Sequence, residues 1–221
     1  MQYITENLAK IQVNLPDKVT LVAVSKTVPM EQIAVAYDAG VRYFGENRVQ
    51  ELLQKLLEGE NLLPEAKWHL IGHLQTNKVR QVVGKVSLIH SVDSLRLAGE
   101  INRVAQQMGI RQDILVQVNL AREDSKFGLD AHEVRPLLDE MAKMPHIRVR
   151  GLMTMAPFVE DPEMVRPLFR DTRVLFDVFG TEYKHAENMP MDTLSMGMSG
   201  DYVVAVEEGA TIVRVGSGVF G

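Results

Sequence analysis

The chain has 221 residues, 46% hydrophobic and 24% charged, and its formal net charge of −5 excludes the overall basic field that recruits nucleic acid. It contains no cysteine, which excludes disulfides, thiolate nucleophiles and cysteine-ligated metals. No apolar run is as long as a membrane span, and residues 1–12 lack the pattern of a signal peptide, so we expect a cytoplasmic protein without a membrane partner.

Short apolar runs alternate with longer amphipathic segments along the whole chain. The first 18 residues predict an extra helix before the first strand. Eight strands are then predicted, at 19–25, 41–45, 67–72, 87–92, 113–120, 149–155, 192–197 and 211–216. Helices are predicted between strands at 30–40, 49–59, 94–109, 133–144, 163–180 and 201–209, and none after the last strand. Gly109 and Gly180 stand where helix C-caps are expected.

Strict alternation of strands and helices indicates a parallel sheet with helical crossovers. About eight repeats in one chain of this size favour an α/β fold, a single (β/α)₈ TIM barrel over residues 1–221. The helix at 1–18 would pack on the barrel and take the place of the missing eighth helix. A doubly wound open sheet is the alternative, and it requires an early G-x-G-x-x-G turn that the sequence does not contain.

Two glycine-rich turns near the C-terminus favour a phosphate site. SMGMSGD (195–201) combines glycines, serine hydroxyls and free backbone N–H groups, which together hold phosphate well. RVGSG (214–218) adds a glycine-permitted backbone approach beside the fixed cation of Arg214. In TIM barrels the loops after the seventh and eighth strands are the usual phosphate-binding loops.

Lys26 directly follows the first predicted strand, in AVSKTVP (23–29). The first and eighth strands are neighbours in a closed barrel, so this amine is expected near the phosphate turns. An amine beside a phosphate site suits pyridoxal 5′-phosphate (PLP), and it equally suits a Schiff-base aldolase that acts on a sugar phosphate. A surface lysine extending from a strand end is the plainer alternative. We interpret His69 and His73 as packing groups or as groups that support the residues of the site, because two ligands rarely make a metal site.

Several blocks, in order, resemble the YggS/PROSC group of pyridoxal 5′-phosphate homeostasis proteins. The blocks are AVSKTVP, FGENRVQE, WHLIGHLQTNKVRQV (68–82), GLMTMAP and the stretch from LSMGMSGD to the C-terminus. The similarity runs from about Leu21 to Gly221, and only the N-terminal helix is generic. The resemblance implies a barrel like the N-terminal domain of alanine racemase. It also implies a protein that binds PLP but has no established reaction.

The resemblance also implies a set of cofactor-binding residues, with no metal-binding or catalytic residue among them. Lys26 would form the internal aldimine, and the turns at 199–200 and 216–217 would hold the phosphate. Arg214 would face the pyridine nitrogen and keep it unprotonated. Asn47 would line the side of the ring hydroxyl. The full set is Lys26, Asn47, Ser195, Met196, Ser199, Gly200, Arg214, Gly216 and Ser217.

Racemisation of an amino acid needs a base on each face of the cofactor. Alanine racemases take one base from a second, β-rich domain and its dimer partner, whereas the predicted barrel uses all of this chain. We therefore expect a monomeric, non-catalytic protein that holds PLP, buffers it and delivers it to apo-enzymes, and so affects amino-acid metabolism. We interpret Lys78 as a solvated lysine rather than a second attachment point.

Three alternatives remain open at this stage. The first is a PLP-dependent racemase or lyase that borrows its second base from an oligomer partner. The second is a cofactor-independent aldolase in which Lys26 traps a sugar phosphate. The third is a protein-interaction regulator whose pocket is vestigial.

Overall fold

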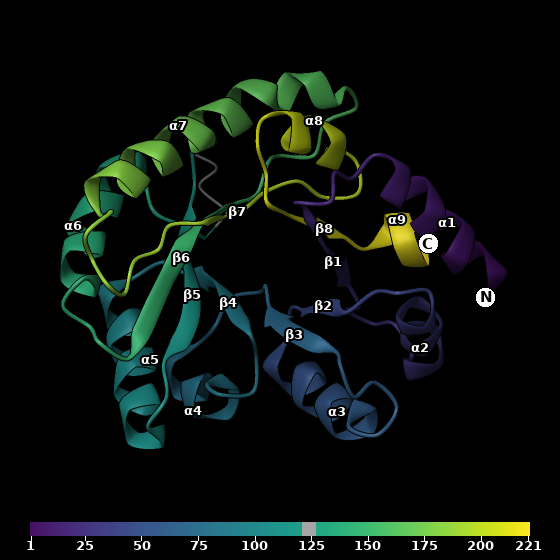
Figure 1. The fold of residues 1–221 in the computed structure, drawn as a ribbon, viewed down its shortest axis with the longest axis horizontal. Coiled ribbons are helices and arrows are strands. Elements are labelled where there is room, and N and C mark those ends of the chain that lie inside the picture. The colour runs from purple at the N-terminus through teal and green to yellow at the C-terminus, as the bar shows by residue number, and fades with distance from the viewer. Residues whose placement is uncertain (121–126) are drawn as a thin grey trace.

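The computed structural model describes residues 1–120 and 127–221 of the chain. Within these residues, eight parallel strands close a barrel in sequential order, and β8 returns to pair with β1 (Figure 1). The predicted TIM barrel is thus confirmed, and the open sheet is excluded. The strands are β1 (Thr20–Val24), β2 (Tyr43–Glu46), β3 (Lys67–Leu70), β4 (Leu88–Val92), β5 (Gln112–Val118), β6 (Ile147–Thr154), β7 (Thr193–Ser195) and β8 (Ile212–Val215).

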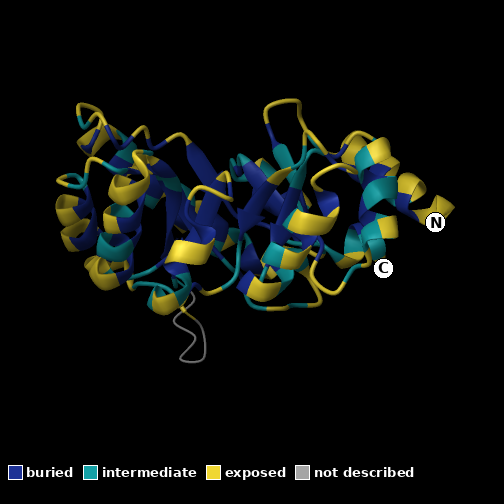
Figure 2. Ribbon diagram, turned by 90° about the horizontal axis from the view of Figure 1, so that it is seen from below, coloured by how far each residue is buried: buried dark blue, intermediate teal, exposed yellow. Residues whose placement is uncertain are grey.

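Helices surround the barrel, and Figure 2 shows that their exposed residues lie on the outside of the molecule. No helix in the described ranges has both the length and the apolar character needed to cross a bilayer. The helices are α1 (Gln2–Val13), α2 (Met30–Asp38), α3 (Val49–Gly59), η1 (Thr76–Lys78), α4 (Val79–Val82), α5 (Leu95–Met108), α6 (Ala131–Met141), η2 (Pro162–Val165), α7 (Arg166–Glu182), α8 (Tyr202–Glu207) and α9 (Ser217–Phe220).

Three helix features differ from the prediction or confirm it in detail. Gly109 caps α5 with the left-handed φ of 68° that glycine adopts without strain, as expected. The C-cap expected at Gly180 is wrong, because α7 continues to Glu182. The expectation that no helix follows the last strand is also wrong: α9 forms there, but its four residues are too few to show a helical period.

The predicted N-terminal helix forms as α1 and packs against both α2 and α9. Its buried residues Ile4, Leu8 and Ile11 recur at the i, i+4, i+7 spacing of one helix face. The Asn7 side-chain amide donates to the carbonyl of Val219 at 3.3 Å. Figure 1 shows the consequence, since α1 and α9 lie side by side and bring the two chain ends together.

Apolar side chains form one large core between strands and helices and one small core inside the barrel. Side chains alternate between the two faces of a strand. In β1, Ala23 belongs to the outer core, whereas Val22 joins the small cluster on the other face. Val24 projects to the same inner face as Val22 and lines a cavity. The small cluster comprises Val22, Leu88, Leu115, Met153 and Ile212.

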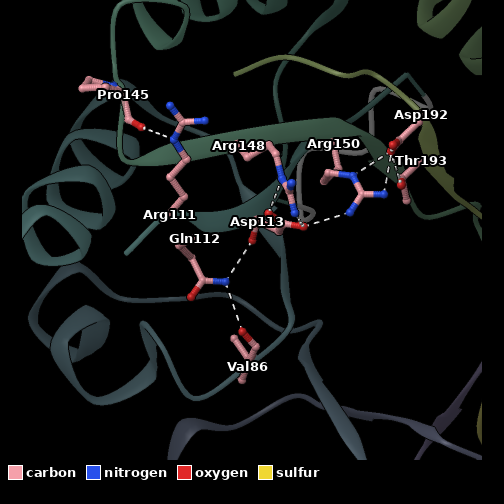
Figure 3. Close-up of polar contacts among 9 residues, drawn as sticks. All are labelled: Val86, Arg111, Gln112, Asp113, Pro145, Arg148, Arg150, Asp192 and Thr193. Carbon is pink, nitrogen blue, oxygen red and sulfur yellow. Dashed lines mark hydrogen bonds and ion pairs between the residues drawn. The ribbon is translucent and has the colours of Figure 1, made fainter. Parts of the chain in front are cut away.

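Ion pairs tie β5, β6 and the start of β7 together at the amino ends of the strands, where Figure 3 shows them. Arg148 makes a bidentate contact to Asp113, with both distances between 2.7 and 2.8 Å. Arg150 donates to Asp113 and also makes a bidentate contact to Asp192. Bidentate arginine–carboxylate pairs fix geometry as well as contribute energy. These ion pairs therefore hold three neighbouring strands together at the amino ends, which lie opposite the end of the barrel that carries Lys26.

Candidate functional site

A cavity of about 880 Å³ opens at the carboxyl ends of the strands. This size lies within the range of small-molecule sites, about 300–1,000 Å³. Two of the nine predicted site residues, Ser195 and Met196, are fully buried and do not line it. The cavity brings together the other seven: Lys26, Asn47, Ser199, Gly200, Arg214, Gly216 and Ser217.

Lys26 follows the end of β1 and lines the cavity with an exposed side chain. Its neighbour Thr27 has a φ of 61°, in the left-handed region that a β-branched residue rarely adopts. Ser25, on the other side, is completely buried. The amine therefore stands on a tight turn between one buried residue and one conformationally unusual residue.

The two glycine-rich turns meet at the Ser199 hydroxyl. Its Oγ accepts hydrogen bonds from the backbone N–H groups of Gly216, at 3.2 Å, and Gly218, at 3.1 Å. Gly197 gives the first turn its shape, with a φ of 93° and no room for a side chain, because a Cβ would lie 2.6 Å from Ala205 Cβ. The turns after β7 and β8 thus line the same cavity as Lys26, although they are far from it in the sequence.

Asp201 closes the first turn from inside. Its carboxylate accepts the backbone N–H of Met198 at 2.5 Å. Burial raises the pKa of Asp201, while this hydrogen bond and the charge of Arg214 act in the opposite direction.

Arg214 is almost fully buried, with 4% of its surface exposed, yet it lines the cavity. Nη1 donates to Ser195 Oγ at 2.5 Å and Nη2 donates to the carbonyl of Thr154 at 2.8 Å. Burial lowers the pKa of Arg214 to about 10, and Asp201 opposes that shift. A guanidinium with this pKa is still charged at neutral pH, so a fixed cation faces the inside of the barrel.

Two buried histidines extend the contacts of Arg214 into the barrel. His90 Nδ1 lies 3.1 Å from Ser195 Oγ, and His90 Nε2 lies 3.0 Å from His69 Nδ1. Burial lowers the pKa of His69 to about 4 and also holds the pKa of His90 well below its usual value. Both rings are therefore neutral at pH 7. His69 therefore packs against His90 and hydrogen-bonds to it inside the barrel.

Sequence reasoning did not assign several residues of the cavity wall to the site. Gly72 passes so close to the loop after β2 that a Cβ would lie 2.2 Å from the Asn47 carbonyl oxygen. The His73 ring stacks on Phe127 with centroids 4.1 Å apart. Gly218 supplies the second N–H to Ser199. The glycines of HLIGH (69–73) and RVGSG (214–218) were the available signal for Gly72 and Gly218, whereas the stacking of His73 has no local signal. Lys78 lies in η1 and does not line the cavity.

Comparison with known proteins gives one family over the whole length. The family model described as "Alanine racemase, N-terminal domain" matches residues 1–221. A pyridoxal phosphate homeostasis protein of Aquifex aeolicus is 47% identical over 201 residues, covering 91% of this chain and 86% of that protein. The resemblance read from the sequence blocks is therefore confirmed.

Solved structures agree with this result. PipY of Synechococcus elongatus, 40% identical, has been solved without PLP, with a TM-score of 0.91, and with PLP bound, with a TM-score of 0.89. In both comparisons the match covers 99% of this chain and 100% of PipY. An alanine racemase of Clostridium difficile is only 16% identical, with a TM-score of 0.78, and the match covers 100% of this chain but 57% of the racemase. That likeness shows a shared barrel fold.

Proposed function

Because the chain belongs to the pyridoxal phosphate homeostasis protein family, we propose that it binds PLP in the cavity at the carboxyl ends of the strands. The observation that carries the proposal is that Lys26 and the turns joined by Ser199 line the same cavity. When bound, PLP supplies an aldehyde with which a lysine amine condenses. We infer that residues 1–221 act as a single cofactor-binding domain in the cytoplasm.

The residues of the cavity fit this cofactor. The N–H groups of Gly216 and Gly218 already converge on an oxygen acceptor, the Ser199 hydroxyl, and a phosphate oxygen is a stronger acceptor of the same kind. A Cβ at Gly200 would meet no atom within 4 Å, so there is open space beside this turn. The wall thus offers backbone donors, a hydroxyl and room for an anion.

Each predicted site residue has a role in this proposal. Lys26 provides the covalent attachment, and the turns at 199–200 and 216–217 hold the phosphate. Arg214 presents a permanent positive charge toward the ring nitrogen and disfavours its protonation. Asn47 lines the side of the ring hydroxyl. Ser195 does not line the cavity but accepts a hydrogen bond from Arg214 and so holds it in place, and Met196 is buried in the apolar core.

We propose that the protein stores and delivers PLP rather than running a catalytic cycle. A racemase or lyase needs an acid or base opposite the attachment lysine. Among the described wall residues, Asp201 is engaged by the Met198 N–H, and His73 is stacked on Phe127. We assign neither side chain the role of that second base. An exposed attachment lysine supports release to PLP-dependent apo-enzymes, because water can reach the C=N bond and hydrolyse it.

Borohydride reduction followed by peptide mass spectrometry tests the binding proposal. The chain is mixed with PLP, reduced and digested, and we expect a pyridoxyl group on Lys26. Lys26→Ala should carry none at the cavity. An unmodified Lys26 in the wild-type protein contradicts PLP binding at this site.

A second measurement separates carrier from enzyme. The loaded protein is incubated with an apo-enzyme that depends on PLP, and in parallel with single enantiomers of amino acids. We expect transfer of the cofactor and no racemisation above that of free PLP. Turnover of an amino acid at an ordinary enzyme rate contradicts the carrier role and supports the racemase or lyase alternative.

A further inference from the structure

Three charged side chains lie directly behind the turn that carries Lys26, and the proposed function gives them no role. They are Glu46 at the end of β2 and the pair Glu51 and Lys55 in α3, referred to below as the Lys55 cluster. Glu46 is completely buried and Lys55 is 6% exposed. Charged side chains are rarely buried this deeply unless they are paired, and Lys55 and Glu46 form an ion pair of 2.7 Å.

Every proton of the Lys55 ammonium is engaged. Nζ donates to Glu46 Oε1 at 2.7 Å, to Glu51 Oε1 at 2.7 Å and to the carbonyl of Ser25 at 2.5 Å. The Ser25 hydroxyl donates to the same Glu46 oxygen at 2.6 Å. The residue before Lys26 is thus fixed through both its carbonyl and its side chain.

The residue after Lys26 is fixed by the same cluster. The backbone N–H of Thr27 donates to Glu51 Oε1 at 2.5 Å, while the Thr27 hydroxyl donates to the carbonyl of Lys26 at 2.6 Å. A left-handed φ at a β-branched residue costs on the order of 1–3 kcal/mol. Such a conformation persists only when its surroundings hold it, and the contact to Glu51 does so.

Stability alone does not account for the cluster. Glu46 Oε2 is buried and has no hydrogen-bond partner among the described residues, which is unfavourable for a carboxylate. Replacement of buried ion pairs by apolar side chains is often neutral or stabilising. Burial raises the pKa of Glu46, and the contacts to Lys55 and Ser25 oppose the shift. The chain therefore keeps a buried carboxylate with one unpaired oxygen where this carboxylate fixes Ser25, the residue before Lys26.

We propose that Glu46, Glu51 and Lys55 are positioning residues, which present the Lys26 amine to the cavity and thereby set how completely a bound aldehyde is captured. This role rests on the proposed function. In the capture step a C=N bond forms between Nζ and the aldehyde carbon, the aldehyde oxygen leaves as water, and the neutral amine supplies both hydrogens of that water. The phosphate turns follow β7 and β8, whereas the cluster belongs to β2 and α3. Capture and phosphate binding should therefore respond separately.

Two ligands resolve the two steps in the full-length protein. PLP reports capture through its visible absorbance and by reduction onto Lys26. Pyridoxine 5′-phosphate carries the same phosphate but no aldehyde, so it reports binding without capture. We expect Lys55→Met and Glu51→Ala to lower the equilibrium constant of capture by about 10- to 100-fold. The affinity for pyridoxine 5′-phosphate should change by less than about twofold.

Glu51→Gln is the conservative variant, because its amide oxygen still accepts the Thr27 N–H, and it should recover most of the capture that Glu51→Ala loses. In the cofactor-free protein the Thr27 amide should exchange its hydrogen about tenfold faster in Glu51→Ala than in wild type. Glu140→Ala removes an exposed ion pair to Lys143 in a distant helix and serves as the matched control, with wild-type capture.

The outcomes separate this role from the proposed function. Unchanged capture in Lys55→Met and Glu51→Ala contradicts only the positioning role and leaves the proposed function intact. An equal loss of affinity for PLP and for pyridoxine 5′-phosphate also contradicts the positioning role, because it indicates general damage to the fold. A wild-type protein without a Lys26 adduct contradicts the proposed function and the positioning role together.

Discussion

Arg214 donates from Nη1 to the hydroxyl oxygen of Ser195 at 2.5 Å, and this contact joins the wall of the cavity to the inside of the barrel. Ser195 in turn lies 3.1 Å from His90, which contacts His69. Arg214 is therefore held by hydrogen bonds to buried polar groups of the barrel.

Replacement of Arg214 should destabilise the protein even without cofactor. Arg214→Met removes the donors to Ser195 Oγ and the Thr154 carbonyl, so Ser195 keeps only its contact to His90 and the buried carbonyl loses this donor. We expect the free energy of unfolding to fall by about 1–3 kcal/mol in urea titrations. Arg80→Met is the control, since Arg80 is exposed and donates a hydrogen bond to the exposed Gln107 side chain, and it should stay within about 0.5 kcal/mol of wild type. Equal effects of the two changes contradict this role of Arg214.

The histidine pair predicts a loss of stability in mild acid. The pKa of His69 is lowered from 6.5 to about 4 in the folded state, so below about pH 6.5 the unfolded chain takes up a proton that the folded protein refuses. The contribution is fully present above that pH and is lost toward pH 4, on the order of 3 kcal/mol for this one ring. His90 shifts in the same direction.

Thermal unfolding of wild type, His69→Leu and His185→Gln from pH 7 to pH 4 measures this effect. His69→Leu should show a shallower dependence of stability on pH, whereas His185→Gln, a change on the surface, should follow wild type. Identical pH dependence in all three proteins contradicts the assignment of neutral buried rings.

Two glycines should respond oppositely to replacement by alanine. In Gly72→Ala the new Cβ would lie 2.2 Å from the Asn47 carbonyl oxygen, so backbone must move, and we expect a loss of several kcal/mol of stability together with weaker PLP binding. In Gly99→Ala, within α5, the Cβ meets nothing within 4 Å, and a gain of about 0.5–1 kcal/mol is expected. Denaturant unfolding of both variants checks the pair, and a tolerated Gly72→Ala would show that the contact is not constraining.

Ser199 should matter for ligands that carry a phosphate. Ser199→Ala removes one hydroxyl from the meeting point of the two turns, and a hydrogen bond to a charged group contributes about 1.5–3 kcal/mol. We expect the affinity for pyridoxine 5′-phosphate, measured by calorimetry, to fall at least about tenfold. Pyridoxine without phosphate should bind wild type and variant equally. If both ligands weaken together, the turn does not hold the phosphate.

The sequence was sufficient for the barrel because its signals are local and repeat. Each strand is a short apolar run, and each long crossover helix has its own hydrophobic period. Because parallel crossovers are right-handed and eight strands are counted, the strands are expected to lie in chain order and to close from β8 to β1. The helix predictions were wrong at two places near the C-terminal part of the chain, where the local sequence pattern is short or ambiguous. The four residues of α9 contain a single turn, and Gly180 resembles a cap although it lies within α7.

The site was predictable only where residues follow strand ends in sequence. Lys26 and Ser199 were identified because barrel topology brings the loops after β1, β7 and β8 together. The contact between His69 and His90 joins residues 21 positions apart on neighbouring strands, and no local pattern marks it. The Lys55 cluster was missed for a similar reason, since an i, i+4 pair of Glu51 and Lys55 is typical of an exposed helix face.

A crystal structure of the protein with PLP would show directly whether Lys26 and the two turns hold one ligand. We expect electron density that is continuous from Lys26 Nζ through the pyridine ring, with the phosphate between the turns at 199–200 and 216–217 and the ring nitrogen toward Arg214. Density for PLP elsewhere, or a phosphate in these turns with Lys26 unattached in the wild-type protein, would contradict it.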